Sequence, residues 1–285
     1  MLKYLILLFL IPVILLSSCG HDNPKPNPIG AGFRFSIYGH NRDRGPAYWV
    51  SVAERMADKF PASMAMGIWI IGEIEGNRAH LNFPGTSDDP NVSFGKTDDN
   101  EAALSYFDTN NVQIWLQVEP GDADMLKVID LVLSRYGEHP CVIGFGVDVE
   151  WYHSQGDKAG GRPVTDEEAS AWMAAVRAHK PSYGLFLKHW DFGWMPPTVR
   201  DGIVFVDDSH QFTSMKQMVD EFTAWGRHFA PSPVAFQYGY PDDRIWWEAL
   251  KDPAAEIGSA ILSDIPNASA LYWVDFSVLE VFPPS

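Results

Sequence analysis

The stretch Cys141-Val-Ile-Gly-Phe-Gly-Val-Asp-Val-Glu-Trp-Tyr152 decides how the rest of the sequence is interpreted. Its first half is apolar and rich in β-branched and aromatic residues, which is typical of a buried strand. It ends with two carboxylates, Asp148 and Glu150, and we expect both to point to one face because side chains alternate along a strand. Buried acids are costly unless they are solvated, hydrogen-bonded or used in chemistry. Two interpretations of this pair of acids therefore remain: a hydrogen-bonded structural pair and a functional pair.

Apolar segments of strand length recur along the chain, and helical periodicity separates most of them. Strand–helix alternation implies right-handed parallel crossovers, and eight such units close into a barrel. We therefore predict an α/β fold, a single (β/α)8 TIM barrel of residues 32–285, with the last helix missing or reduced to 278–282. An open doubly wound sheet is the alternative, although no Gly-x-Gly-x-x-Gly follows a strand. The predicted strands span residues 33–38, 63–71, 112–118, 141–152, 183–189, 202–206, 233–238 and 268–274.

The segments between these strands carry the signals of helices and loops. Thr165 and Glu168 form a capping box that predicts a helix start. Residues 77–100 form a long polar loop, a kind of segment that tends to be functional or mobile. The predicted helices span residues 47–60, 101–109, 122–136, 165–176, 214–228 and 243–263, the last of them interrupted at Pro253.

The N-terminal residues predict a targeting segment rather than a part of the fold. Lys3 precedes an apolar segment, residues 4–16, which is too short for a comfortable membrane span. Together with Leu16-Ser17-Ser18-Cys19 it resembles a bacterial lipoprotein signal. The resemblance implies a signal peptide over residues 1–18, a lipidated Cys19 and a Pro/Gly/Asn-rich tether over residues 19–31. The implied location is the bacterial cell envelope, with the membrane contacted only through the lipid. A plain secretory peptide is the alternative.

Composition excludes several classes of partner. The net charge of −16 argues against nucleic acid and against an anionic membrane surface. An acidic chain with 11 Trp, 10 Tyr and 17 Phe suits a neutral partner that stacks on aromatic rings, and carbohydrate is the obvious class. The chain has no His-x-x-x-His or Cys-x-x-Cys, so we predict neither a metal nor another cofactor. Two cysteines, one of them Cys19, leave no disulfide framework.

Polar residues gather where the predicted strands end. In a barrel these carboxyl ends form the active site. Carboxylates there perform acid/base and nucleophile chemistry on glycosidic bonds, and aromatic faces stack on sugar rings. We predict Glu150 and Asp148 as catalytic residues, with substrate contacts from Tyr38, Glu73, Glu119, Tyr152, Trp190, Asp207, Gln237, Tyr238 and Trp273.

The motif Gly146-Val-Asp-Val-Glu-Trp-Tyr152 resembles the strand-four motif of the chitinase-like glycoside hydrolases of family 18, Asp-x-x-Asp-x-Asp-x-Glu followed by an aromatic residue. The resemblance implies that Glu150 protonates the leaving oxygen. It implies that Asp148 orients the N-acetyl group of the substrate, which attacks the anomeric carbon. It further implies that Trp273 lies at the barrel floor beneath the sugar and that Asp207 contacts the substrate.

The match is partial. The first two aspartates of the motif fall on Ile143 and Gly146, and another alignment places Tyr152 at the acid position. The family 25 lysozymes offer a weaker resemblance through Asp-x-Glu and Phe236-Gln237-Tyr238, although residues 33–38 lack the aspartate of their first strand. We therefore expect a glycosidase that acts on a glycan, with N-acetylhexosamine as one candidate unit. A non-catalytic glycan-binding barrel lipoprotein is the alternative.

Overall fold

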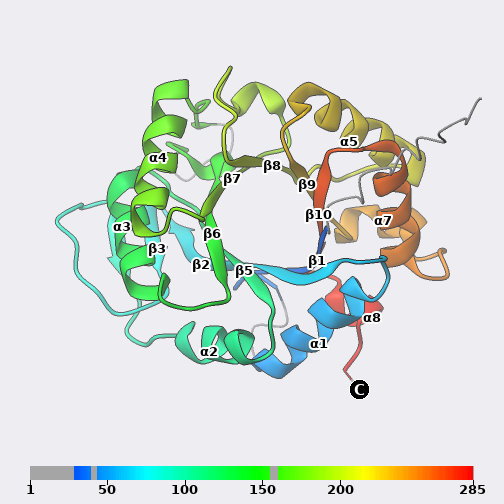
Figure 1. Ribbon diagram of the computed structural model, residues 1–285, viewed down its shortest axis with the longest axis horizontal. Helices are drawn as coiled ribbons and strands as arrows, with labels where there is room; N and C mark the ends of the chain where they lie inside the picture. The colour runs from blue at the N-terminus through cyan, green and yellow to red at the C-terminus, as the bar shows by residue number, and fades with distance from the viewer. Residues whose placement is uncertain (1–28, 40–43, 155–159, 285) are drawn as a thin grey trace, which may run out of the picture.

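The chain folds into a closed barrel of parallel strands (Figure 1). The computed structural model describes residues 29–39, 44–154 and 160–284. The first barrel strand pairs with both the second and the last, which closes the sheet and confirms the predicted (β/α)8 architecture. The barrel strands are β1 (Gly30–Phe35), β2 (Met64–Glu75), β5 (Gln113–Val118), β6 (Val142–Asp148), β7 (Gly184–Lys188), β8 (Ile203–Asp207), β9 (Val234–Tyr238) and β10 (Ala268–Val274).

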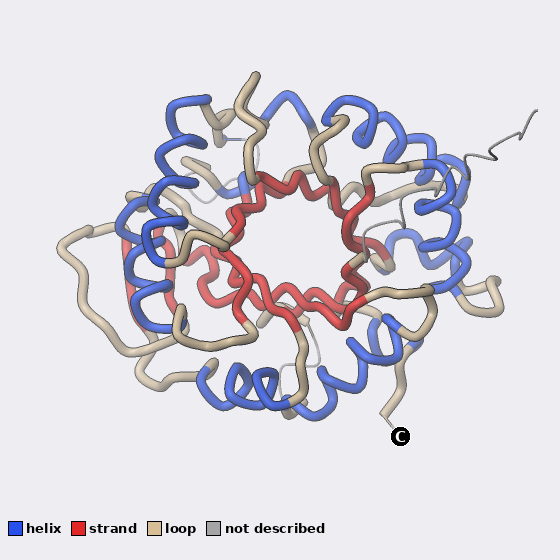
Figure 2. The backbone as a smooth tube through the Cα atoms, viewed as in Figure 1, coloured by secondary structure: helices blue, strands red, loops and turns tan. Residues whose placement is uncertain are grey.

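Helices surround the strands as an outer layer (Figure 2). The capping box at the start of one helix is present as predicted, with the Thr165 hydroxyl accepting from the Glu168 N–H and the Glu168 carboxylate accepting from the Thr165 N–H. The interruption at Pro253 and the reduced last helix are also confirmed. The helices are α1 (Pro46–Ala57), α2 (Glu101–Thr109), α3 (Met125–Tyr136), α4 (Asp166–His179), α5 (Met215–Phe229), α6 (Arg244–Trp247), α7 (Pro253–Asp264) and α8 (Val278–Val281).

The barrel begins earlier than the sequence pattern indicated. β1 starts at Gly30, so the last two residues of the predicted tether are a buried part of the sheet. The glycine among them reflects close packing rather than a flexible linker, since a Cβ on Gly30 would lie 2.5 Å from the sulfur of Met66 on the neighbouring strand. The predicted signal peptide, Cys19 and the rest of the tether lie outside the described residues and stay predictions.

Two other segments differ from expectation. The polar segment 77–100 contains two short strands, β3 (Arg78–Leu81) and β4 (Val92–Phe94), and β3 pairs antiparallel with the extended end of β2. The strand that carries the paired acids ends at Asp148, and a 3-10 turn, η1 (Val149–Trp151), follows it. Asp148 and Glu150 therefore do not share a strand face, because the alternation on which that prediction depends stops between them.

The core has two parts that follow from strand alternation. Apolar side chains that point outward from the barrel pack against the helices in one large cluster. Those that point inward form a smaller cluster inside the barrel, in which the rings of Trp115 and Phe186 meet edge to face. This inner cluster closes the barrel lumen, so the strand ends above it form the floor of the mouth. Among the helices of the described residues, none is both long and apolar enough to cross a bilayer.

Candidate active site at the barrel mouth

A buried ammonium group lies at the centre of the mouth. Lys188 ends β7, is only 2% exposed, and points inward because it follows the inward-facing Phe186 by two residues. Its Nζ lies 2.9 Å from Oδ2 of Asp148 on β6 and also pairs with Asp208, which follows β8. Burial alone would lower the pKa of Lys188, but these two carboxylates raise it well above its ordinary value. Lys188 therefore carries its charge and ties three neighbouring strands together.

A second ion pair joins the first and last strands of the barrel. Arg34 Nη1 lies 2.7 Å from Oδ1 of Asp275, which follows β10. The other oxygen of Asp275 accepts hydrogen bonds of 2.8 Å from both the N–H and the hydroxyl of Ser36. The side chains of all three residues are buried. The pair holds the β1–β10 seam at the mouth.

Two glutamates lie on the β2–β5 side. Oε2 of Glu119 accepts hydrogen bonds from the Tyr38 hydroxyl at 2.5 Å and from the Ile74 N–H at 2.9 Å. Burial raises the pKa of Glu119, and these bonds oppose the rise. Burial also raises the pKa of Glu73 to about 7; Asn82 opposes this rise and the nearby charge of Glu119 adds to it. Glu73 is thus poised to exchange a proton near neutral pH.

The pKa values of the two carboxylates that pair with Lys188 are shifted in opposite directions. Burial raises the pKa of Asp148 to about 8 despite Lys188, and the charges of Glu150 and Glu119 add to the rise. For Asp208 the ion pair and hydrogen bond to Lys188 outweigh burial and lower the pKa. The pKa of Asp148 is therefore raised and that of Asp208 lowered, although both carboxylates pair with Lys188. Pairs of acids separated in this way are typical of sites that perform acid/base chemistry.

These side chains belong to one inward-facing set, which we call the mouth ring. Every member is nine-tenths or more buried, and most follow the alternation that places the inner apolar cluster beneath them. Glu73 instead comes after a register shift in β2, and Tyr240 lies beyond the end of β9. Within it the Tyr240 hydroxyl donates to Oε1 of Gln237 at 3.3 Å, and Nε2 of Gln117 donates to Oδ2 of Asp148 at 3.3 Å. The mouth ring consists of Arg34, Glu73, Gln117, Glu119, Asp148, Lys188, Asp208, Gln237 and Tyr240.

The structure brings several of the predicted site residues together. Asp148, Glu73, Glu119 and Gln237 belong to the mouth ring, and Tyr38 is bonded to it. Glu150 lies in η1, mostly buried, and acts electrostatically on both Asp148 and Lys188. Trp190 follows β7 and is 52% exposed, with one face stacked on His189. It can offer an aromatic surface beside the ring.

Three predicted substrate contacts lie on the other side of the barrel wall. Asp207 is adjacent to the inward-facing Val206 and therefore points outward, where its Oδ1 accepts from the Ser209 N–H. Tyr238 likewise points outward and donates to the carbonyl of Ala254 in α7. The fully buried Trp273 packs among these outer residues rather than at the barrel floor. Each of the three lies one residue away from an inward-facing position. Their prediction as substrate contacts is therefore corrected: they are outward-facing residues of the barrel wall.

Tyr152 also lies away from the mouth ring. Its hydroxyl donates to Oε1 of Glu168 at 2.7 Å, and its ring meets Trp172 of α4 edge to face. Arg162 covers the ring and bonds the same carboxylate. Tyr152 therefore stabilises the start of α4 and is not placed to replace Glu150 at the mouth.

Arg34, Lys188 and Asp208 were not selected from the sequence. The signal that could have identified the last two was strand alternation counted upward from the apolar inner residues Phe186 and Val206. For Arg34 the signal was its position between the apolar, outward-facing Phe33 and Phe35 in the predicted first strand.

Cavities flank the mouth on two sides. A cavity of about 340 Å³ opens between β1, β2 and α2 and includes Asn82, the residue that acts on Glu73. A wider groove of about 600 Å³ lies between the starts of α3 and α4 and includes Tyr152. None of the mouth carboxylates lines either cavity, and Asn82 is the link between the smaller cavity and Glu73.

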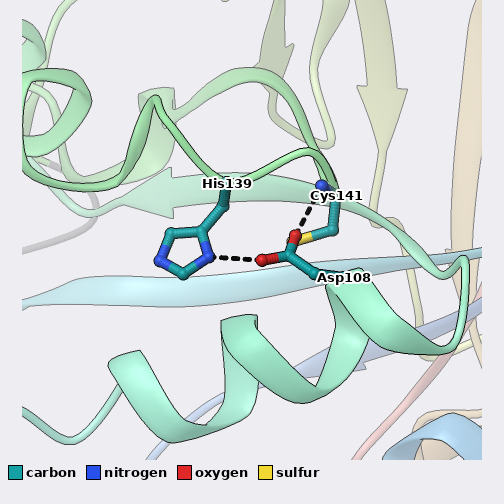
Figure 3. Close-up of side chains that lie close together, drawn as sticks. All are labelled: Asp108, His139 and Cys141. Atoms are coloured by element: carbon teal, nitrogen blue, oxygen red, sulfur yellow. Dashed lines mark hydrogen bonds and ion pairs between the residues drawn. The ribbon is translucent and has the colours of Figure 1, made fainter.

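A separate cluster of potential metal ligands lies at the opposite, amino-terminal end of β6 (Figure 3). Asp108 at the end of α2 accepts from the Cys141 N–H at 2.8 Å and lies 2.7 Å from Nδ1 of His139. The Cys141 thiol donates weakly to the Leu104 carbonyl, and burial raises its pKa. These groups already hydrogen-bond to one another, and the thiol is held protonated. We therefore interpret the cluster not as a metal site but as a clasp, a set of contacts that joins α2 to the start of β6.

Comparison with known proteins adds information on the fold. No protein-family model and no curated protein matches the sequence. The structure is similar to a β-D-glucuronidase from Dictyoglomus thermophilum, with a TM-score of 0.50, 11% identity, and coverage of 86% of this chain and 43% of that one. It is also similar to a protein of Bacteroides thetaiotaomicron provisionally assigned as an α-L-fucosidase, with a TM-score of 0.52, 11% identity, and coverage of 93% and 92%.

Both neighbours are named as glycosidases, and the chain spans less than half the length of the glucuronidase. At 11% identity the likeness shows a shared barrel fold, and a shared barrel does not by itself define a reaction. The function must be inferred from the mouth itself.

We predict that Lys188→Met destabilises the protein by about 3–5 kcal/mol, because it leaves two buried carboxylates without their cation. Without this cation the folded-state pKa values of both carboxylates rise, so the folded state of the variant binds more protons than the unfolded state. The free energy of unfolding of the variant should fall as pH rises from about 5 to 8. Urea unfolding across that range, with Lys127→Met as the surface control, measures this. A variant that gained stability with rising pH would contradict the assignment.

We predict that Trp273→Leu lowers the free energy of unfolding by about 2–4 kcal/mol, since a large, fully buried ring is lost together with its 3.0 Å hydrogen bond to Ser277. The exposed Trp190→Leu should stay within about 0.5 kcal/mol of wild type. Chemical denaturation of both variants tests the buried placement of Trp273. Equal losses in the free energy of unfolding would argue against that placement.

We predict that Asp108→Asn costs about 1–3 kcal/mol at pH 7 through the loss of charge-assisted bonds to His139 and Cys141. Hydrogen bonds from both partners outweigh burial and lower the pKa of Asp108. Its contribution is therefore complete above the unfolded pKa and is lost as pH falls through the folded pKa. The gap between wild type and variant should narrow below about pH 4, whereas a gap that stays constant down to pH 2 would refute the clasp. Asp201→Asn, on the surface, is the control.

Proposed function

We propose that the barrel mouth hydrolyses a glycosidic bond, with Glu150 as the general acid assisted by Asp148. The observation that carries the proposal is that carboxylates of raised pKa and a carboxylate of lowered pKa lie together in the mouth ring. Glycoside hydrolysis needs one carboxyl group that holds a proton for the leaving oxygen and another that is ionised. Asp148 and Glu73, with pKa values near 8 and 7, and Asp208, with its lowered pKa, provide both kinds at one mouth.

The position of Glu150 supports its assignment. It follows Asp148 in the turn η1 and interacts electrostatically with both Asp148 and Lys188, so it lies within reach of the ring. Oδ2 of Asp148 is bonded to Lys188 and Gln117, whereas Oδ1 has no hydrogen-bond partner among the described residues. That oxygen can contact a substrate group beside Glu150, the role that the chitinase-like resemblance implies.

A non-catalytic glycan-binding barrel is the second candidate. The observation that favours it is the ion pair between Asp148 and Lys188, which gives Asp148 a structural reason to be present without any chemistry. Binding without turnover distinguishes this function from hydrolysis.

We predict that Glu150→Gln lowers kcat at least about 100-fold, because it removes the transferable proton while preserving the shape of the side chain. The test follows hydrolysis of defined glycans, including N-acetylhexosamine polymers, by the full-length protein. Glu54→Gln on the exposed face of α1 is the control and should retain full activity. The melting temperature of both variants should match wild type.

Full activity of Glu150→Gln would remove Glu150 from the mechanism. If wild type binds glycans but releases no product from any of them, the proposal of hydrolysis fails and the binding function replaces it.

A further inference from the structure

The mouth ring contains more acid than base. Its cations are Arg34 and Lys188, and both are committed: Arg34 to Asp275 and Lys188 to Asp148 and Asp208. Within residues 29–39, 44–154 and 160–284, no lysine or arginine forms an ion pair with Glu73 or Glu119. The ring therefore holds a surplus of negative charge when its carboxylates are ionised.

The ring also contains buried polar atoms that have no hydrogen-bond partner among the described residues. Buried polar atoms are rarely left in this state, so a ligand group that supplies partners is favoured. Strand alternation aims all of these side chains except Glu73 at the mouth, and each is nine-tenths or more buried. Oxygen acceptors outnumber nitrogen donors among them. The atoms are Glu73 Oε2, Gln117 Oε1, Asp148 Oδ1, Asp208 Oδ1, Gln237 Nε2 and Arg34 Nε.

Surplus negative charge and surplus acceptors favour the same ligand chemistry. An ammonium group has three donors and no acceptor, and the hydroxyls of a sugar supply the remaining donors and acceptors. A carboxylate on the ligand would instead meet ionised oxygens in a poorly solvated site. We propose that the mouth ring selects a sugar unit bearing a protonated amino group over the corresponding neutral or anionic sugar. This inference names a substrate class for the proposed function and rests on the same site.

Binding of such a cation is coupled to proton release. Burial raises the pKa values of Glu73 and Asp148, and a neighbouring positive charge, which stabilises their ionised forms, favours the release of their protons. The other titratable or charged groups on the elements around the mouth set the background for this exchange. They are Arg34, Tyr38, Arg44, Asp99, Glu119, Glu150, Lys188, His189, Asp208, Tyr240 and Asp275.

The test uses three β-1,4-linked tetrasaccharides that differ only at carbon 2: deacetylated chitotetraose, N-acetylated chitotetraose and cellotetraose. We expect the full-length protein, studied by isothermal titration calorimetry at pH 6, to bind the deacetylated tetraose at least tenfold more tightly than the other two. Titrations in two buffers of different ionisation enthalpy should show protons released with the deacetylated ligand only.

Glu73→Gln should reduce the preference for the deacetylated tetraose over cellotetraose at least fivefold. Glu75→Gln, two residues further along β2 and exposed, is the matched control and should keep the preference.

Equal affinity for the three tetraoses, or no binding of any of them, would overturn the proposed selectivity whatever the behaviour of the variants. Neither result bears on hydrolysis of another glycan, which the Glu150→Gln assay decides separately. A strong preference without any turnover would support the selectivity and reject the hydrolase.

Discussion

The buried ammonium of Lys188 is the group on which the upper end of the barrel depends. A charge this far from water persists only because Asp148 and Asp208 lie beside it on the neighbouring strands. One cation cannot neutralise every acid at the mouth, so some carboxylates keep their protons while others ionise. The aromatic cluster beneath, which includes Trp115 and Phe186, excludes water from below and strengthens these effects. The same contact thus organises both the fold and the candidate chemistry.

Most of the architecture was predictable from the sequence because its signals are local. Apolar runs, the capping box at Thr165 and the interruption at Pro253 each depend on nearby residues. The side of the barrel wall to which each side chain at a strand end points was less predictable, because a shift of one residue in the predicted pattern moves a side chain to the opposite side. Asp207 was predicted as a substrate contact, but it is the next residue, Asp208, that faces the mouth. Tyr238 and Trp273 are likewise each adjacent to a residue that points inward. The 3-10 turn after Asp148 depends on tertiary packing that no local pattern indicated.

The incomplete match to the chitinase-like motif has a steric cause in this barrel. At Gly146, where the motif carries an aspartate, a Cβ would lie 2.0 Å from the ring of Phe186. The aromatic inner cluster therefore occupies the space that an upstream aspartate would need. Any acid chemistry must instead use Asp148 and Glu150 together with carboxylates from other strands. Glu73 and Glu119 are the candidates that the fold brings to the same mouth.

The central claim is that burial divides the carboxylates of the mouth ring into protonated and ionised groups around Lys188. Carbon-13 NMR titration of the Asp and Glu side-chain carboxyl groups, assigned through Asp148→Asn, Glu73→Gln and Asp208→Asn, measures this directly. We expect Asp148 and Glu73 to titrate near pH 8 and 7, while Asp208 stays ionised to below its ordinary range. Titration of all three groups below about pH 5 would contradict it.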